Sequence, residues 1–192
     1  SSVSLTKNLT PQVSWTSSEA QPAKVEYQID DKSYKQAGTA ASGSFTIPAG
    51  EIGTSGVHTI RVKMTDKAGN VSDPVGTRYH VDVDAPVFSS LEMTKSSFLF
   101  PSANRAPVIT WEIEDAAMKN VYYSVGDGES VRVSSGAEGS VTLPETVWGN
   151  TENGKFVISV YAEDAAGNMC EAETLNYYLK SVENPEEYVP KD

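Results

Sequence analysis

Three aromatic residues in the second half of the chain have positions that a ligand-binding surface would need. Tyr122 and Tyr161 alternate with apolar neighbours, so both are expected to point outward from strands that share a sheet. Trp148 lies in a nearby connecting segment. Exposed aromatic rings stack on sugar or peptide faces when polar groups surround them. The three residues therefore form a candidate ligand-binding site. The alternative is ordinary exposed tyrosines beside a Trp148 that covers the edge of the core.

Two aspartates, Asp82 and Asp84, form a candidate calcium site near the middle of the chain. Ca²⁺ takes about six to eight oxygen ligands, several of them carboxylates. The segment 82–88 faintly resembles the calcium-binding linker of cadherins, although the other acidic cadherin motifs are not found in this sequence. An ordinary linker with solvated carboxylates is the alternative. Two histidines and one cysteine give zinc almost no support.

Histidine and cysteine, which often serve as catalytic acids, bases or nucleophiles, are rare in this chain, and their positions do not predict an enzyme. His58 and His80 are the only histidines. His58 occupies an inward position that Phe156 fills in the second half, so a ring packed at the edge of the core explains it. Cys170, the single cysteine, is expected to be a half-buried apolar residue and not a nucleophile. We therefore predict no catalytic residues and no cofactor.

An internal repeat positions all of these residues. Pro11–Trp15 recurs as Pro107–Trp111, an offset of 111 − 15 = 96. The run 66–70 recurs as 164–168, an offset of 98, so two residues are inserted between these motifs in the second copy. A repeat of this length indicates two copies of one module. At the positions of Tyr122 and Tyr161 the first copy has Glu26 and Lys63, so the copies differ on this face.

Apolar residues alternate with polar ones throughout both copies. His58, Ile60, Val62 and Met64 share one face of a segment, and no segment has an apolar stripe of helical period. Asp127-Gly128 lies between two such segments and favours a hairpin turn. Short strands separated by such turns predict an all-β chain of two tandem β-sandwiches.

These residues also carry a family resemblance. Trp15 in Val-Ser-Trp-Thr looks like the buried tryptophan of the second strand of fibronectin type III-like sandwiches. The run 56–70 resembles the last hairpin of bacterial immunoglobulin-like (Ig-like) modules, and 81–86 resembles the junction that follows it. The resemblance implies tandem Ig-like or fibronectin-like modules of a bacterial protein that is secreted or displayed on the cell surface. We expect Trp15 and Trp111 to be buried at equivalent places in the two cores.

The repeat also sets the expected domain limits. Residues 1–84 form the first sandwich, 85–181 the second, and 182–192 a polar linker tail. The 107 − 86 = 21 positions from Pro86 to Pro107 leave room for an added first strand through Leu91 and Met93. Its counterpart in the first sandwich would lie before Ser1, so the first strand of that sandwich is expected to be truncated. We take this as a sign that the chain comes from a longer parent, whose flanking domains are its expected partners.

Composition limits the classes of function. The net charge is 15 − 26 = −11, which disfavours nucleic acid and anionic membranes as partners. No apolar stretch is long enough to predict insertion into a membrane. The leading interpretation is a non-catalytic spacer or adhesive unit of a larger bacterial surface or secreted protein. The alternative is a pair of accessory carbohydrate- or peptide-binding modules in a polysaccharide-degrading protein.

A stiff junction between the two modules is the first testable prediction. The last strand of the first module is expected to continue through Val81, only a few residues before Pro86, whose ring fixes its φ. So short a junction has little slack compared with a Gly/Ser linker. Small-angle scattering should therefore give an elongated particle with a narrow distribution of shapes. A compact or broadly distributed particle would contradict the prediction, and a shape that changes strongly with calcium would favour the metal site.

Overall fold

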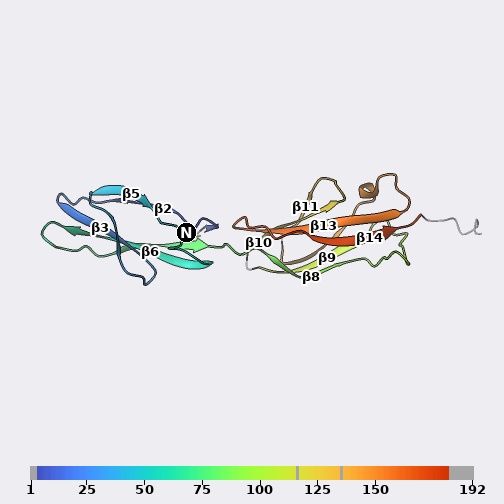
Figure 1. Cartoon of the computed structure of the whole chain (residues 1–192), viewed down its shortest axis with the longest axis horizontal. Coiled ribbons are helices and arrows are strands. Elements are labelled where there is room, and N and C mark those ends of the chain that lie inside the picture. The colour runs from blue at the N-terminus through green and yellow to red at the C-terminus, as the bar shows by residue number, and fades with distance from the viewer. Residues whose placement is uncertain (1–3, 116, 135, 182–192) are drawn as a thin grey trace, which may run out of the picture. The chain divides into compact units, whose positions relative to one another are not determined.

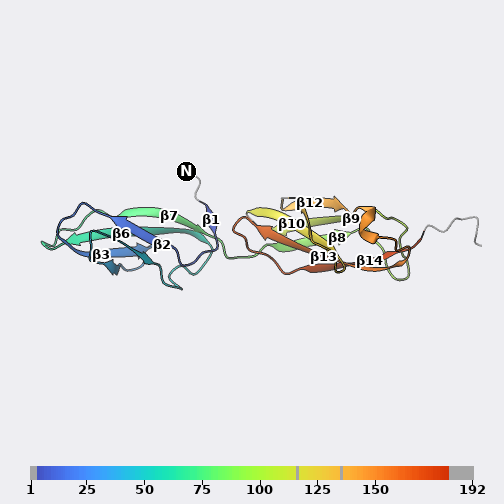
Figure 2. The ribbon, with the colours of Figure 1, turned by 90° about the horizontal axis from the view of Figure 1, so that it is seen from above.

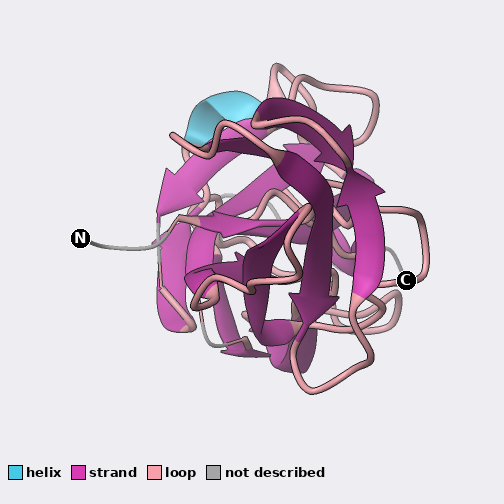
Figure 3. Cartoon of the chain, turned by 90° about the vertical axis from the view of Figure 1, so that its left-hand side faces the viewer, coloured by secondary structure: helices cyan, strands magenta, loops and turns pink. Residues whose placement is uncertain are grey.

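In a computed structural model the chain forms two compact units, which divide between Asp84 and Ala85 except that Ala166–Asn168 are grouped with the first unit. The structure describes residues 4–115, 117–134 and 136–181, so the expected linker tail at 182–192 lies outside the described residues. The described elements are strands apart from one turn of 3₁₀ helix, which is cyan in Figure 3. The predicted all-β class is therefore confirmed.

The first unit has two sheets. One contains five strands in the order β1-β7-β6-β3-β4, and the other pairs β2 with β5 (Figure 1). The pairings are antiparallel except that of β1 with β7, which is parallel. The strands are β1 (Leu5–Thr6), β2 (Gln12–Thr16), β3 (Pro22–Ile29), β4 (Lys35–Gly38), β5 (Ser42–Thr46), β6 (Gly56–Asp66) and β7 (Val75–Val81).

The second unit repeats this arrangement with two differences: its smaller sheet has an added strand, and in place of β1 the described part of its larger sheet has only an isolated parallel bridge between Ser102 and Leu179. Its sheets have the orders β11-β10-β13-β14 and β12-β9-β8 (Figure 2). The added strand is β8, which pairs with β9. The elements are β8 (Val87–Met93), β9 (Val108–Glu114), β10 (Met118–Val125), β11 (Val131–Ser134), β12 (Glu138–Thr142), the 3₁₀ helix η1 (Glu145–Trp148), β13 (Gly154–Asp164) and β14 (Glu173–Leu179).

Each unit has its own apolar core, which lies between its two sheets. In the second unit, side chains of β9 pack against side chains of β10, β13 and β14. In the first, side chains of β3 and β6 meet Ile47 and Ile52, which follow β5. Successive strand residues point to opposite sheet faces, so the period-two pattern of the sequence places one apolar set inward. The separate cores explain why the chain behaves as two units.

A tryptophan lies at the same place in each core. The Trp15 indole Nε1 donates to Ala40 O at 3.1 Å, and that of Trp111 donates to Gly136 O at 3.3 Å. Trp111 is 3% exposed, as expected, but Trp15 is only half-buried. The expectation of full burial is therefore correct for Trp111 and wrong for Trp15.

We predict that Trp111→Ala destabilises the second unit by about 3–5 kcal/mol, the usual range for truncating a buried large aromatic residue. Trp15→Ala should destabilise the first unit by less, because less of the Trp15 ring leaves water on folding. The two losses are measured by denaturant unfolding, with each transition assigned to its unit by hydrogen exchange. Equal losses, or a larger loss for Trp15→Ala, would contradict the prediction.

Candidate functional site

The structure brings Tyr122 and Tyr161 together on the outer face of the larger sheet of the second unit. They are direct cross-strand partners on β10 and β13. Their rings are stacked, with centroids 5.0 Å apart and planes at 11°. Both rings are half-buried, whereas the neighbouring Tyr123 and Val160 point into the core and are buried. The outward orientation expected from the sequence is therefore present, and the two rings form one aromatic surface.

A carboxylate holds this aromatic surface in place. Glu163 Oε2 accepts hydrogen bonds from the Tyr122 hydroxyl at 2.8 Å and from Asn120 Nδ2 at 3.0 Å. Glu163 Oε1 accepts one from Lys119 Nζ at 2.8 Å. These three donors, Lys119 foremost, lower the pKa of Glu163 to about 2. The hydrogen bond to Glu163 in turn raises the pKa of the Tyr122 hydroxyl.

This arrangement suits binding better than catalysis. A carboxylate with a pKa of about 2 is ionised at neutral pH and is a poor proton acceptor. Both oxygens of Glu163 already have donors, so its role is to orient the Tyr122 ring. A ring held in one rotamer loses little entropy when a ligand stacks on it. The sequence reasoning missed Glu163, Asn120 and Lys119 as members of this site.

The same cross-strand positions in the first unit have a different chemistry. Glu26 faces Lys63 across β3 and β6, in the register that pairs Tyr122 with Tyr161. Lys63 Nζ lies 3.8 Å from Glu26 and 3.9 Å from the centroid of the Tyr34 ring. Lys24 Nζ also bonds to Glu26, at 2.9 Å. The first unit therefore has an ion-paired face where the second has stacked aromatic rings.

Trp148 does not belong to this surface, which corrects the sequence-based expectation. Its side chain is 2% exposed and packs in the second core, with its ring stacked 5.3 Å from Tyr177 and edge-on to Phe156. The indole Nε1 donates to Arg105 O at 2.6 Å. The physical reason is that η1 turns Trp148 inward at the end of the sandwich. A ligand therefore cannot stack on this ring.

Asp82 and Asp84 lie directly after β7. Asp82 Oδ1 accepts hydrogen bonds from Asp84 N at 3.2 Å and from Ser55 Oγ at 3.4 Å. Asp82 is half-buried and Asp84 is exposed. These contacts give the Asp82 carboxylate a structural role in the turn. The calcium site stays a prediction.

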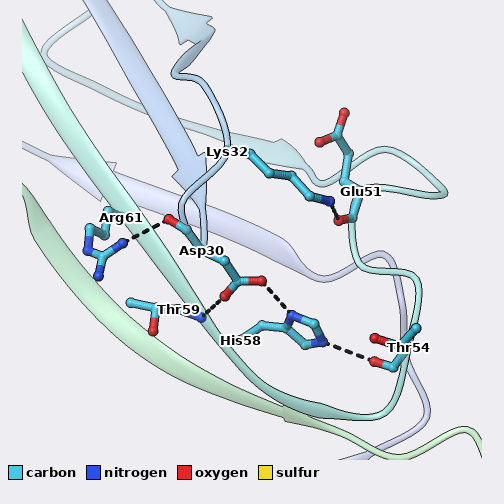
Figure 4. A network of polar contacts seen from close by, with 7 residues as sticks. All are labelled: Asp30, Lys32, Glu51, Thr54, His58, Thr59 and Arg61. Atoms are coloured by element: carbon cyan, nitrogen blue, oxygen red, sulfur yellow. Dashed lines mark hydrogen bonds and ion pairs between the residues drawn. The ribbon is translucent and has the colours of Figure 1, made fainter.

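A polar network in the first unit surrounds His58, as Figure 4 shows. Its Nδ1 lies 2.8 Å from Asp30 Oδ2, and its Nε2 lies 2.9 Å from Thr54 O. Asp30 Oδ1 accepts from Thr59 N at 2.8 Å, and Asp30 O accepts from Arg61 Nη1 at 2.9 Å. The network ties the turn after β3 to the start of β6 and to the loop before it. The sequence reasoning placed His58 at the edge of the core but missed its partner Asp30.

Both partners of the imidazole are acceptors, so the protonated ring, with two N–H donors, fits best. The hydrogen bond with Asp30 and that with Thr54 raise the pKa of His58. Burial alone would raise the pKa of Asp30, but the hydrogen bonds with His58 and Thr59 outweigh it and lower that pKa. With both nitrogens engaged, His58 has no lone pair to activate a nucleophile. Cys170 is half-buried, and burial raises the pKa of its thiol, which disfavours the reactive thiolate.

The comparisons with known proteins agree with this architecture. Residues 1–84 match the model of the bacterial Ig-like domain family. The resemblance to bacterial Ig-like modules is therefore confirmed for the first unit, and the second unit repeats its sandwich architecture. No curated protein matches the chain. The described residues include no helix that is long and apolar enough to cross a membrane.

Several solved structures are similar to the chain at low sequence identity. The fibronectin(III)-like modules of Clostridium thermocellum CbhA have 18% identity, with 95% of this chain and 93% of that chain covered and a TM-score of 0.46. A Ca²⁺-stabilized adhesin with which an Antarctic bacterium binds ice has 17% identity, coverage of 90% and 44%, and a TM-score of 0.48. A tetra-tandem repeat from the extending region of a large adhesion protein has 16% identity, coverage of 91% and 51%, and a TM-score of 0.40.

The His58 network predicts a pH dependence of the stability of the first unit. The folded pKa of His58 is raised above 6.5, so its contribution is fully present below about pH 6.5 and is lost as pH rises through the folded value. The folded pKa of Asp30 is lowered from 3.8, so its contribution is present above that value and is lost as pH falls through the folded pKa. The stabilisation should therefore be largest between about pH 4 and 6.5.

Thermal unfolding of the first unit between pH 5 and 9 measures this effect. The control is His58→Phe, because Phe156 occupies the counterpart position in the second unit and does not titrate. The Tm of the native first unit should fall relative to that of the variant as pH rises above 6.5. Parallel pH profiles for the two proteins would contradict the role of His58.

Proposed function

We propose that the chain is a pair of non-catalytic spacer or adhesive modules of a larger bacterial cell-surface or secreted protein. The observation that carries the proposal is the repeat of one Ig-like sandwich, of which residues 1–84 match a bacterial family. Two sandwiches with separate cores add length to a protein, and each unit folds around its own core. In this proposal the partners are the flanking domains of the parent chain.

The polar networks support a non-catalytic role. Two side chains that could serve in acid–base chemistry are engaged in holding strands and turns. Glu163 orients Tyr122, and His58 joins Asp30 to the Thr54 loop. The pKa of Glu163, at about 2, is far from the near-neutral pKa values of acid–base catalysts, and both ring nitrogens of His58 already have hydrogen-bond partners.

A second candidate function is carbohydrate or peptide binding on the aromatic surface of the second unit. The specific observation in its favour is the Tyr122–Tyr161 stack, fixed by Glu163 and replaced by Glu26 and Lys63 in the first unit. A core position shared by two copies reflects the fold, whereas a difference on an outer face is where a ligand site can arise. Such a site would suit an accessory module of a polysaccharide-degrading protein. Calcium at Asp82 and Asp84 would be a separate property of the turn after β7.

A ligand screen separates these two functions. As a spacer, the native chain should bind nothing above background on arrays of polysaccharides and peptides. If it binds, the double variant Tyr122→Ala/Tyr161→Ala should abolish the binding. Its Tm should fall by only a few degrees, since a cross-strand aromatic pair contributes roughly 0.2–1 kcal/mol.

The matched control is Glu26→Ala/Lys63→Ala, which changes the same cross-strand positions of the first unit. Its binding should equal that of the native chain. Binding that survives the tyrosine variant, or is lost equally in both variants, would exclude the aromatic surface as the site. Binding that depends on the two tyrosines would replace the spacer function by the second candidate.

A further inference from the structure

The first unit has a groove of about 620 Å³ that the function proposed above does not use. It runs along one edge of β2 and reaches across to β6 and β7. Apolar side chains, with the indole ring of Trp15 among them, share its lining with small polar side chains and with Lys63 and Asp73. The lining residues from β2 include Val13, Trp15 and Thr16, and those from β6 and β7 include Ile60, Val62 and Val75.

In the second unit a strand covers the corresponding edge. β8 pairs with β9 in antiparallel register, with Leu91 opposite Trp111 and Met93 opposite Ile109. Phe88, Leu91 and Met93 pack against the core. β9 is the counterpart of β2 by the repeat offset of 96. In the first unit the smaller sheet is β2 with β5, and no described residue pairs with the other edge of β2.

Core burial differs between the units along this edge. Ile109, Trp111 and Val160 are buried in the second unit, and their counterparts Val13, Trp15 and Val62 are only half-buried in the first. Several positions farther from the edge are buried in both units: Val25 and Val121, Ile47 and Leu143, and Ile60 and Ile158. Two other pairs differ without a common direction, since Tyr79 is half-buried where Tyr177 is buried, and Val125 is half-buried where Ile29 is buried. At the β2 edge, by contrast, three neighbouring positions are all less buried in the first unit, where no described counterpart of β8 covers them.

The backbone along the edge is arranged to pair with a strand. Pro11 O accepts from Ile47 N at 3.0 Å, and Ser17 N donates to Ala41 O at 2.8 Å, so odd-numbered residues of this segment bond toward the β5 side. Bonding alternates along an antiparallel strand, so the intervening even-numbered residues direct their backbone N–H and C=O groups outward. Such an edge is a template for pairing with another strand. The outward residues are Gln12, Ser14 and Thr16.

We infer that this groove is a strand-accepting site whose occupant is an extended, antiparallel segment with the side-chain pattern of β8. The occupant supplies backbone bonds to the edge of β2 and apolar side chains spaced as Phe88, Leu91 and Met93 are. Main-chain bonds give such strand addition its affinity, and the alternate side chains in the groove give it specificity. The sequence of β8 itself is the example of the occupant that the chain provides.

A peptide of residues 85–96 tests the inference on the whole chain. Titrated into ¹⁵N-labelled protein, it should shift the indole N–H resonance of Trp15 in a saturable way. The Trp111 resonance should stay in place, because β8 already covers that ring. The control peptide replaces Phe88, Leu91 and Met93 by Ser and should leave both resonances unchanged.

Ser14→Pro provides a matched change in the protein. The Ser14 N–H points away from β5, so proline keeps the β2–β5 bonds while removing a donor that the peptide needs. The variant should melt within a few degrees of the native chain and bind the peptide at least about tenfold more weakly. Because the control peptide leaves the protein unaltered, the test remains decisive even if this variant folds poorly.

A graft provides an independent measurement. Because the offset is 96, placing residues 85–96 directly before Ser1 gives the first unit a β8 sequence at the spacing found in the second. The Tm of the first unit should rise by about 5 °C or more, and the graft should no longer bind the peptide.

Three results would overturn the inference. One is an unchanged Trp15 resonance at millimolar native peptide. Another is an equal shift of Trp15 and Trp111, which would indicate binding unrelated to the edge of β2. The third is a stable dimer that does not bind the peptide, because a second copy of the chain would then occupy the groove.

Discussion

Each unit depends on the close approach of one indole ring to a glycine on the neighbouring strand. Trp15 faces Gly43 across β2 and β5, and Trp111 faces Gly139 across β9 and β12. A Cβ at Gly43 or Gly139 would lie 2.7 or 2.5 Å from Cζ2 of the ring, closer than packed atoms approach. The ring therefore covers the partner strand and places its Nε1 beside a carbonyl before that strand. This contact fixes the pairing register, on which the inward alternation of the small sheet depends.

The two units share their core packing but differ in some turn and edge residues, and residues that contact each other differ together. Asp30 has a left-handed φ of 52°, where the second unit has Gly126 at 55°. The aspartate accepts the backbone strain of this conformation, and its side chain bonds His58, whose counterpart is Phe156. The pair Gly126 and Phe156 of the second unit therefore corresponds to the pair Asp30 and His58 of the first. Both positions differ together because the side chains of Asp30 and His58 are hydrogen-bonded to each other.

The parts of the structure that sequence predicts well are those with a regular period. The core strands follow from alternation, and the outward stack of Tyr122 and Tyr161 follows from alternation together with sheet neighbours. Trp148 was misplaced because η1 is a single turn with no period to read. The role of Glu163 could not be predicted because a bulge between Met118 and Asn120 shifts the strand register, and this shift places Asn120 opposite Glu163. The Asp30–His58 pair could have been predicted from the sequence, because both positions differ between the copies: the second copy has Gly126 and Phe156 there.

The half-burial of Trp15 could not be predicted for a different reason: it does not depend on Trp15 or on the residues next to it in the sequence. The burial of the equivalent Trp111 depends on a strand about 20 residues earlier in the chain, since Leu91 of β8 lies opposite it. A core residue near a sheet edge is thus only as buried as the edge is covered.

The exposed apolar residues of the second unit do not define the geometry of a binding partner as the edge of β2 does. Phe98, Leu99 and Phe100 are 77–79% exposed at a loop tip of the second unit. There two backbone bonds between Ser97 and Phe100 close a turn, which is not part of a strand. Exposed side chains on a turn accept many shapes, whereas a strand edge with outward backbone groups beside a groove accepts an extended strand in one register. The edge of β2 therefore specifies the geometry of its partner, and the loop tip does not.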